Sequence, residues 1–276
     1  MEYEEKLGIM QGRLLPKYKG RYQAHPIDYW EDEFPIAADM GLAFIEFIFD
    51  YNDIERNPLM DSKGLQRIVT LSERYGVQVK TVCADYFMEY PVFSDVPEIR
   101  DRSREVLKKL ISQCSLIGVT DIVIPCVDAS SLLTEKMKHD FVEFINTLKD
   151  GIEEKDINLS LETDLNPVAF SKLLSDIGSR NVTVNYDAGN SASWGYDIHS
   201  EFSEYGDRIS DIHIKDRIFG GGSVVLGQGD VDFDCLLKEM EYINYKGPVI
   251  FQAYRDDEGL EIFKKQLEWY KSLLQK

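Results

Sequence analysis

The chain has 276 residues, of which 43% are hydrophobic and 29% charged, the ordinary balance of a globular protein with a large core. It carries 49 acidic against 31 basic residues, a formal net charge of −18. So acidic a surface repels nucleic-acid phosphates and anionic membranes while attracting divalent cations.

The charged start MEYEEKLG argues against a signal peptide, and no run reaches the 18 apolar residues of a membrane helix. With four cysteines that form no CxxC pair, these features predict a reduced, cytoplasmic protein that binds neither nucleic acid nor membrane.

Short apolar runs alternate with longer amphipathic runs along the chain. The expected strands are, in order, Leu7–Gln11, Phe44–Phe49, Val77–Cys83, Asp121–Cys126, Asn158–Glu162, Thr183–Asp187, Ile209–Ile214 and Pro248–Gln252. The expected helices between and after them include Glu98–Ile117, Lys136–Glu154, Pro167–Ile177 and Glu258–Leu274. Gly76 and Gly118 stand where a left-handed C-cap would end a helix before the next strand.

Eight such repeats predict an α/β fold, a (β/α)8 TIM barrel forming a single domain over residues 1–276, because such a barrel takes about 250 residues. A doubly wound open sheet is the structural alternative. Its phosphate-binding hallmark, GxGxxG after the first strand, is missing, since the chain there reads Gly8-Ile9-Met10-Gln11-Gly12-Arg13.

Polar residues follow the last four predicted strands, at the end where a barrel has its mouth. Glu162, Asp187, His213 and Gln252 end strands five to eight and are therefore expected to converge. Two carboxylates, an imidazole and an amide oxygen suit one divalent metal ion, Mn²⁺, Zn²⁺, Co²⁺ or Mg²⁺. Alternatively, the carboxylates cap loops and His213 is a hydrogen-bonded core histidine. Four residues at corresponding strand ends favour the metal site.

The arrangement resembles the xylose-isomerase-like barrel superfamily, which holds sugar and sugar-phosphate isomerases and epimerases together with endonuclease IV. The resemblance covers essentially the whole chain. The motifs that carry it are the opening Gly8-Ile9-Met10-Gln11-Gly12-Arg13-Leu14, the Glu162 strand end, Asp187-Ala188-Gly189-Asn190, His213-Ile214-Lys215-Asp216 and the glycine-rich Leu226-Gly227-Gln228-Gly229-Asp230-Val231-Asp232-Phe233. It implies that Glu162, Asp187 and His213 bind metal, and that Gln252 stands where the family usually has a second glutamate.

This glutamine is the main departure from the family. The epimerases use both glutamates as metal ligands and to move protons on opposite faces of the substrate. An amide oxygen can bind a metal but cannot act as a base. Glu162 alone could still remove a proton from the substrate and return it on the same face. The candidates for a second proton carrier are Lys215, Asp85 and Glu46. We therefore expect an isomerase or epimerase of a small sugar or sugar phosphate that works through a metal-stabilised enediolate, with Glu162 and Lys215 as catalytic residues.

Further polar residues near strand ends are candidates for substrate binding. They are Arg13, Glu46, Asp85, Tyr86, Asn190, Lys215, Arg217 and Arg255. The four cations among them suggest an anionic substrate group, a phosphate or carboxylate, with surface salt bridging as the alternative. Asp85 and Tyr86 either contact substrate hydroxyls or pack in a rim loop. Glu46 either points into the mouth or pairs with a helix lysine.

Three other functions are alternatives for this chain. An endonuclease IV-like phosphodiesterase is disfavoured, because that chemistry uses three metals and many histidines, whereas this chain has four histidines and has Asn190 where a histidine ligand would follow Asp187. A lyase or dehydratase on a related carbohydrate acid would need the same metal site. A non-catalytic sugar-binding barrel is made plausible by Gln252. The sugar, the native metal and the oligomeric state are open; barrels of this type often pair, which leaves a homodimer as a candidate.

Overall fold

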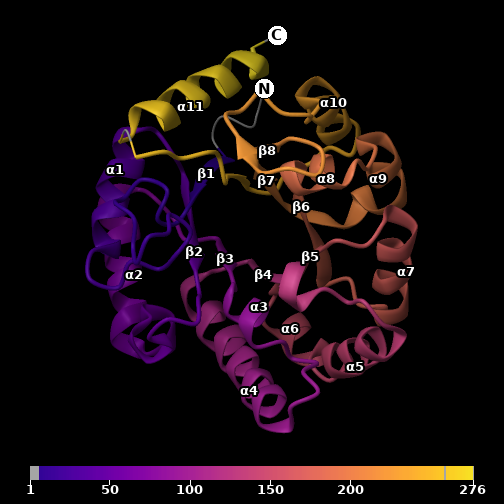
Figure 1. Ribbon diagram of the computed structural model, residues 1–276. Coiled ribbons are helices and arrows are strands. Elements are labelled where there is room, and N and C mark those ends of the chain that lie inside the picture. The colour runs from indigo at the N-terminus through magenta and orange to yellow at the C-terminus, as the bar shows by residue number, and fades with distance from the viewer. Residues whose placement is uncertain (1–5, 258, 276) are drawn as a thin grey trace.

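The computed structural model describes residues 6–257 and 259–275. Eight parallel strands close into a barrel in the order β1-β10-β7-β6-β5-β4-β3-β2, ringed by helices (Figure 1). These strands are β1 (Leu7–Met10), β2 (Phe44–Ile48), β3 (Thr81–Cys83), β4 (Asp121–Cys126), β5 (Asn158–Thr163), β6 (Val182–Asp187), β7 (Ile209–Ile214) and β10 (Val249–Phe251). Each of the eight predicted strands is present, and the closed barrel excludes the open doubly wound sheet.

Helices connect the strands and cover the outside of the barrel. The α-helices are α1 (Glu33–Asp39), α2 (Ser62–Tyr75), α3 (Tyr86–Glu89), α4 (Pro97–Cys114), α5 (Glu135–Asn146), α6 (Lys149–Glu154), α7 (Pro167–Ile177), α8 (Ala188–Trp194), α9 (Ile198–Tyr205), α10 (Phe233–Tyr242) and α11 (Glu261–Leu274). The 3-10 turns are η2 (Trp30–Asp32), η3 (Ile54–Arg56), η4 (Pro58–Met60), η5 (Ser115–Ile117), η6 (Asp128–Ser130) and η7 (Gly206–Arg208). Within residues 6–257 and 259–275, no helix is both long and apolar enough to span a bilayer.

The predicted helices differ from the observed ones mainly at their ends. The helix expected over Lys136–Glu154 is two helices, α5 and α6, separated at Thr147, whose Oγ1 donates a hydrogen bond of 2.7 Å to the carbonyl of Phe144. A side-chain hydroxyl that donates to a carbonyl of the preceding turn competes with the backbone N–H groups that would continue the helix. Residue Glu258, the predicted start of the last helix, lies outside the described residues, and α11 begins at Glu261.

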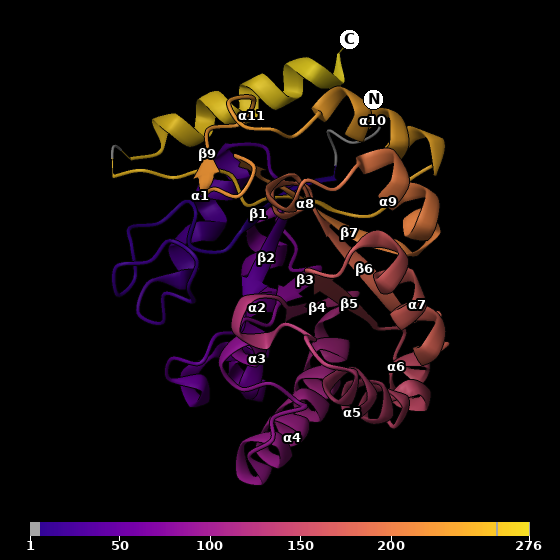
Figure 2. The ribbon, with the colours of Figure 1, turned by 45° about the vertical axis from the view of Figure 1, so that its right-hand side comes forward.

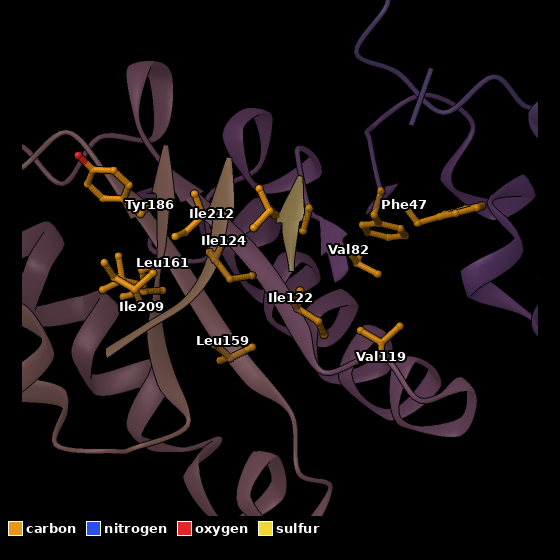
Figure 3. Packing of buried hydrophobic residues seen from close by; sticks show 14 of the residues in the cluster. Phe47, Val82, Val119, Ile122, Ile124, Leu159, Leu161, Tyr186, Ile209 and Ile212 are labelled. Atoms are coloured by element: carbon orange, nitrogen blue, oxygen red, sulfur yellow. The ribbon is translucent and has the colours of Figure 1, made fainter. Parts of the chain in front are cut away.

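Successive side chains of each strand point alternately out of the barrel and into it, and this alternation divides the hydrophobic core into an outer and an inner part. Leu159 and Leu161 of β5 point outward and pack with helix residues in the large hydrophobic cluster, part of which Figure 3 shows. A smaller cluster, formed by Met10, Ile48, Cys83, Val123 and Ile250 from strands on one side of the barrel, contains no helix residue. The interior positions of β5, β6 and β7 are instead largely polar. TIM barrels usually fill this space with branched aliphatic side chains, so the polar half marks the side on which the site is built.

The helix α11 completes the ring by covering the last strand. Phe251 of β10 makes edge-on contacts with Phe263 and Tyr270 of α11, at ring-centroid distances of 5.9 and 5.2 Å. Figure 2 shows α11 running across the top of the barrel beside α1 and α10. The small antiparallel sheet of β8 (Asp216–Arg217) and β9 (Ser223–Val224) follows β7 on the mouth side. This sheet places the residues after His213 next to α8.

Candidate functional site

The turn from β6 into α8 is one corner of the site. Asp187 ends β6 and caps α8, because its Oδ1 accepts a 2.8 Å hydrogen bond from the backbone N–H of Asn190. An aspartate cap satisfies an otherwise unpaired helix N–H and fixes the direction in which the helix leaves the strand. Asp187 is paired in register with His213 of β7. The sequence Asp187-Ala188-Gly189-Asn190 thus holds a carboxylate and an amide together at the mouth.

Asn190 joins the residues around it into one network. Its Nδ2 donates to Glu162 Oε1 at 2.5 Å. Its Oδ1 accepts from Lys215 Nζ at 3.1 Å and from Arg217 Nη1 at 2.7 Å. All four residues were predicted to belong to the site, and the structure brings them together. Asn190 therefore orients one carboxylate and two cations at the same time.

Lys215 is held between α8 and β6. Its ammonium group lies 3.2 Å from Asp187 Oδ2. Gly189 makes this possible, since a Cβ at that position would lie 2.6 Å from the Lys215 Cγ and 3.1 Å from its backbone carbon. Arg217 donates to the carbonyl oxygen of Gly221 from Nε at 3.0 Å and from Nη2 at 2.7 Å, so the glycine loop 220–222 fixes its position.

Two of the predicted metal ligands have buried polar atoms without a hydrogen-bond partner among the described residues. His213 is fully buried, its Nδ1 lies 4.0 Å from Asp187 Oδ2, and Nδ1 has no hydrogen-bond partner among the described residues. The Gln252 Oε1 is likewise buried without a partner in this part of the chain. Buried acceptors are rarely left unsatisfied, and a divalent cation would satisfy both beside Glu162 and Asp187. The donor set therefore fits a metal ion.

A tighter acidic cluster lies deeper in the barrel. In residues 6–257 and 259–275, the group of acidic, cysteine or histidine side chains whose ligand atoms all lie within 4.8 Å of one another is Glu46, Asp211 and His213. His213 Nε2 lies 2.8 Å from Glu46 Oε1 and 3.9 Å from Asp211 Oδ2. Each of the three side chains has an exposed fraction of 0%. Glu46 thus lies beneath His213, neither at the open mouth nor beside a helix lysine.

Gln23, in the long loop after β1, connects Gln252 to the opposite side of the mouth. The Gln252 Nε2 donates to Gln23 Oε1 at 2.8 Å, and Gln23 Nε2 donates to Asp85 Oδ2 at 3.1 Å. Arg13 donates to the same Gln23 oxygen at 3.3 Å and to the Ala253 carbonyl at 3.2 Å. In this network the Gln252 amide nitrogen is used for a hydrogen bond, which leaves its oxygen available.

Burial governs the ionisation of the site. Burial, followed by the nearby Asp187 carboxylate, raises the pKa of Glu162 to about 7, against the opposing effects of His213 and Lys215. Burial likewise raises the pKa of Glu46 to about 7 and that of Asp211 well above its ordinary value. Burial lowers the pKa of Arg13 to about 10. A carboxyl group with a pKa near neutrality is suited to take and return protons.

Two of the predicted substrate residues, Tyr86 and Arg255, make contacts with residues outside this network. Tyr86 is 3% exposed and packs against Phe49 and Phe87, at ring-centroid distances of 5.7 and 5.2 Å, which is the arrangement of a packed rim loop. Arg255 lies over the ring of Tyr22, 4.6 Å from its centroid, and donates from Nη1 to the carbonyl of Gly259. Both residues have structural partners that account for their positions.

The sequence reasoning did not single out Gln23 or Asp211. Gln23 belongs to a loop with no pattern that could have indicated a role. Asp211 could have been found, because it lies two residues before His213 on β7, and residues two apart on a strand face the same side. An acid beside a histidine inside a barrel was the available signal.

Comparisons with known proteins agree with this architecture. A family model described as xylose isomerase-like TIM barrel matches residues 34–273. The chain is 24% identical over 263 residues to the L-ribulose-5-phosphate 3-epimerase UlaE of Shigella boydii serotype 18, covering 90% of each protein. Its fold is similar to that of the 3-keto-D-glucoside 4-epimerase YcjR from Escherichia coli, with a TM-score of 0.75, 15% identity and coverage of 97% and 99%. The IOLI protein with a bound zinc atom gives a TM-score of 0.75 at 17% identity, with coverage of 98% and 97%.

Proposed function

Because this chain belongs to the xylose isomerase-like TIM barrel family, we propose that it is a divalent-metal-dependent isomerase or epimerase of a small sugar or sugar phosphate. The observation that carries the proposal is the pair of buried polar atoms without partners among the described residues, His213 Nδ1 and Gln252 Oε1, which lie at strand ends next to those of Glu162 and Asp187. These four residues would hold the metal. The bound cation would supply positive charge that acidifies the C–H beside a substrate carbonyl.

Glu162 is the proton carrier in this proposal. Its carboxyl group is buried beside Asp187, His213 and Lys215, and a carboxylate in this position can remove a proton from the substrate and return it. The hydrogen bond from Asn190 to Oε1 orients the carboxyl group. Lys215, held between Asp187 and Asn190, is positioned to donate or receive a second proton. Asp85 is the further candidate on the opposite side, linked to Gln252 through Gln23.

The substrate class follows from the charges at the mouth. Arg13 and Arg217 are held by neighbouring oxygen atoms, and Arg255 lies beyond them over Tyr22. Fixed guanidinium groups bind carboxylates and phosphates through paired hydrogen bonds. The UlaE relative acts on a sugar phosphate by its name, which supports a phosphorylated ketose as the first substrate to test. The homodimer and the cytoplasmic location stay predictions from the sequence.

Deuterium exchange tests the proposal. Purified protein loaded with Mn²⁺ would be incubated in D₂O with a panel of ketoses and ketose 5-phosphates, and the expected result is deuterium on the carbon beside the carbonyl. Chelation of the metal should abolish the exchange, as should Glu162→Gln. The matched control is Glu143→Gln, an exposed glutamate of α5. Failure of every sugar to exchange with the loaded protein would count heavily against the proposal.

A lyase or dehydratase acting on a related carbohydrate acid is the second candidate. It is favoured by Gln252, whose amide nitrogen is committed to Gln23 and which cannot serve as the second base. Such an enzyme needs the same base and cation but expels a hydroxyl group instead of reprotonating the carbon. Release of water with formation of a keto-deoxy product from sugar acids, in the absence of epimer formation, would select this candidate over the first.

A further inference from the structure

The interior of the barrel beneath His213 contains two acidic side chains for which neither the fold nor the proposed proton transfer accounts. Glu46 and Asp211 are each 0% exposed, and the carboxyl oxygens of both residues have no hydrogen-bond partner among the described residues. An unpaired buried carboxyl group is costly. The two carboxyl groups lie against each other, Glu46 also lies beside Thr81, and Glu46 Oε1 approaches the His213 ring to 2.8 Å. We therefore expect these carboxyl groups to influence the His213 ring.

We propose that Glu46 is a positioning residue that fixes the tautomer and ring orientation of His213. Its carboxylate accepts a hydrogen bond from the Nε2–H group, so that Nδ1 faces the mouth with a lone pair that can bind a metal. This inference rests on the proposed function in one respect only, that the Nδ1 of His213 binds a metal. Its structural basis is the 2.8 Å approach of Glu46 Oε1 to Nε2, on the side of the ring away from Asp187.

The chemistry of imidazole supports this assignment. A neutral imidazole carries one proton, so a ring that offers a lone pair at Nδ1 must carry its proton on Nε2. That N–H lies in a fully buried site and needs an acceptor. Histidines that bind metals commonly donate their other N–H to a carboxylate, which holds the ring in place. The two atoms are 2.8 Å apart but do not meet the angular criteria of a hydrogen bond in this structure, so a small rotation of the Glu46 side chain or of the ring completes the bond, with or without metal.

Glu46 is better placed for this role than Asp211. The distance from Nε2 to Glu46 Oε1 is 2.8 Å, whereas that to Asp211 Oδ2 is 3.9 Å. The contact also spans the interior of the barrel, because β1 and β10 lie between β2 and β7 (Figure 1). Side-chain length is therefore decisive. The shorter carboxylate of Glu46→Asp should fail to reach the ring even though its charge is retained.

An inner cation is the competing explanation for the same three side chains. It would require the Nε2 lone pair, which a ring bound to metal through Nδ1 does not have unless it loses both protons. The two explanations differ in metal stoichiometry. Positioning by Glu46 predicts that wild-type protein binds a single Zn²⁺, whereas an inner site predicts a second ion that is lost in Glu46→Met.

Two measurements test the proposal, the first without any metal. In metal-free protein labelled with ¹⁵N-histidine, ¹⁵N NMR at pH 8 reports the tautomer of each of the four histidines. Wild-type His213 should show a protonated Nε2 and a bare Nδ1, and Glu46→Met should lose this preference. Glu46→Gln, which keeps an acceptor oxygen of the same reach, should retain it. An unchanged tautomer in Glu46→Met overturns the proposal.

The second measurement is the affinity for Zn²⁺ by calorimetry. Glu46→Met and Glu46→Asp should each weaken binding roughly 10- to 100-fold, the usual effect of losing a residue that holds a metal-binding histidine. Asp121→Asn is the matched control, since Asp121 is also a buried barrel acid but bonds to Asn158; its affinity should equal that of the wild type. Equal affinities in Glu46→Met and wild type, or a second Zn²⁺ that the variant loses, overturn the proposal. If no metal binds to wild-type protein, the proposed function fails while the NMR result still decides the role of Glu46.

Discussion

Asn190 donates a 2.5 Å hydrogen bond to Glu162 while its own backbone N–H is bonded to Asp187. A single asparagine at the start of α8 thus links the proposed base to a proposed metal ligand. The resemblance to endonuclease IV implies a histidine ligand at this position, three residues after Asp187. In this chain the position holds an amide that bonds to Glu162, and its contribution can be measured.

Asn190→Ala should lower the rate of deuterium exchange roughly 10- to 100-fold, because the Glu162 carboxyl group loses the donor that orients it. Lys215 and Arg217 lose their shared acceptor in the same variant. Exchange rates measured at saturating Mn²⁺ separate this effect from weaker metal binding. Asn146→Ala, at the exposed end of α5, is the control. Equal rates in the two variants would show that Glu162 needs no orientation by Asn190.

Gln252→Glu restores the second carboxylate that the family usually has. We expect a gain in epimerase activity together with a lower melting temperature. The loss of stability follows because the new carboxylate oxygen would face the Gln23 carbonyl oxygen, and turning the Gln23 amide would set that carbonyl against Asp85. Such a mismatch between buried polar groups costs about 1–3 kcal/mol. Epimer formation and thermal unfolding are the measurements.

No gain in epimerisation from stably folded Gln252→Glu protein would mean that the amide is not what limits two-base chemistry. In that case the one-base transfer by Glu162, or the dehydratase alternative, would account better for the site. Combining the substitution with Asp85→Asn removes the conflict with residue 85 when the Gln23 amide turns, at the cost of the weaker 3.3 Å bond from Arg13 to Gln23 Oε1. The double variant should therefore recover part of the lost melting temperature.

Gly189→Ala should displace Lys215, because the added Cβ would lie 2.6 Å from the lysine Cγ. Overpacking of this kind costs about 1–3 kcal/mol, and the loss should appear in the free energy of unfolding as well as in the exchange rate. Gly151→Ala in α6 is the matched control, since its Cβ would meet no atom within 4 Å. That variant should be as stable as the wild type or more so, by up to about 1 kcal/mol. Equal stability of the two alanine variants would contradict the packing argument.

The pH dependence of stability should report the ionisation of Glu33, which bonds to the backbone on either side of Arg13. Its carboxylate accepts hydrogen bonds from the backbone N–H groups of Gly12 and Leu14, yet burial raises its pKa from 4.5 to about 7. The unfolded chain therefore loses this proton at lower pH than the folded chain does. The stabilisation is complete below about pH 4.5 and is lost as the pH rises to about 7, a change on the order of 3 kcal/mol.

Urea unfolding of metal-free protein at pH 4.5 and pH 7.5 measures this change. Glu46 and Glu162 also have raised pKa values, so the wild-type curve contains several contributions. The difference between wild type and Glu33→Gln isolates one of them, and Glu33→Gln should lose less stability over this interval. If the stability difference between the two proteins is the same at both pH values, Glu33 does not titrate in this range.

The strand positions could be predicted because each strand has an apolar outer face of about the right length. The boundaries of β4 and β7 were predicted without error, and Pro167–Ile177 was predicted as the whole of α7. Helix ends were less accurate where side chains compete with the backbone, as at Thr147. The residues that follow β5, β6 and β7 could be assigned to one mouth because parallel strands in a barrel end on the same side.

The contacts across the barrel could not be predicted in this way. The approach of Glu46 to His213 depends on strand tilt and on the reach of a side chain across two intervening strands. The bond from Gln252 to Gln23 depends on the path of a long loop, for which the chain has no periodic pattern. Both contacts join residues far apart in sequence, and each sets the orientation of a proposed metal ligand.

The sequence by itself determined the closed barrel and the set of polar residues at its mouth, because both follow from local periodicity and from the common direction of parallel strands. Only the tertiary structure decided which atoms of those residues are free to bind and which are already engaged. The physical reason is that a change of a few tenths of an ångström in the donor–acceptor distance decides whether two side chains form a hydrogen bond. These distances are set by the folded arrangement of the whole barrel.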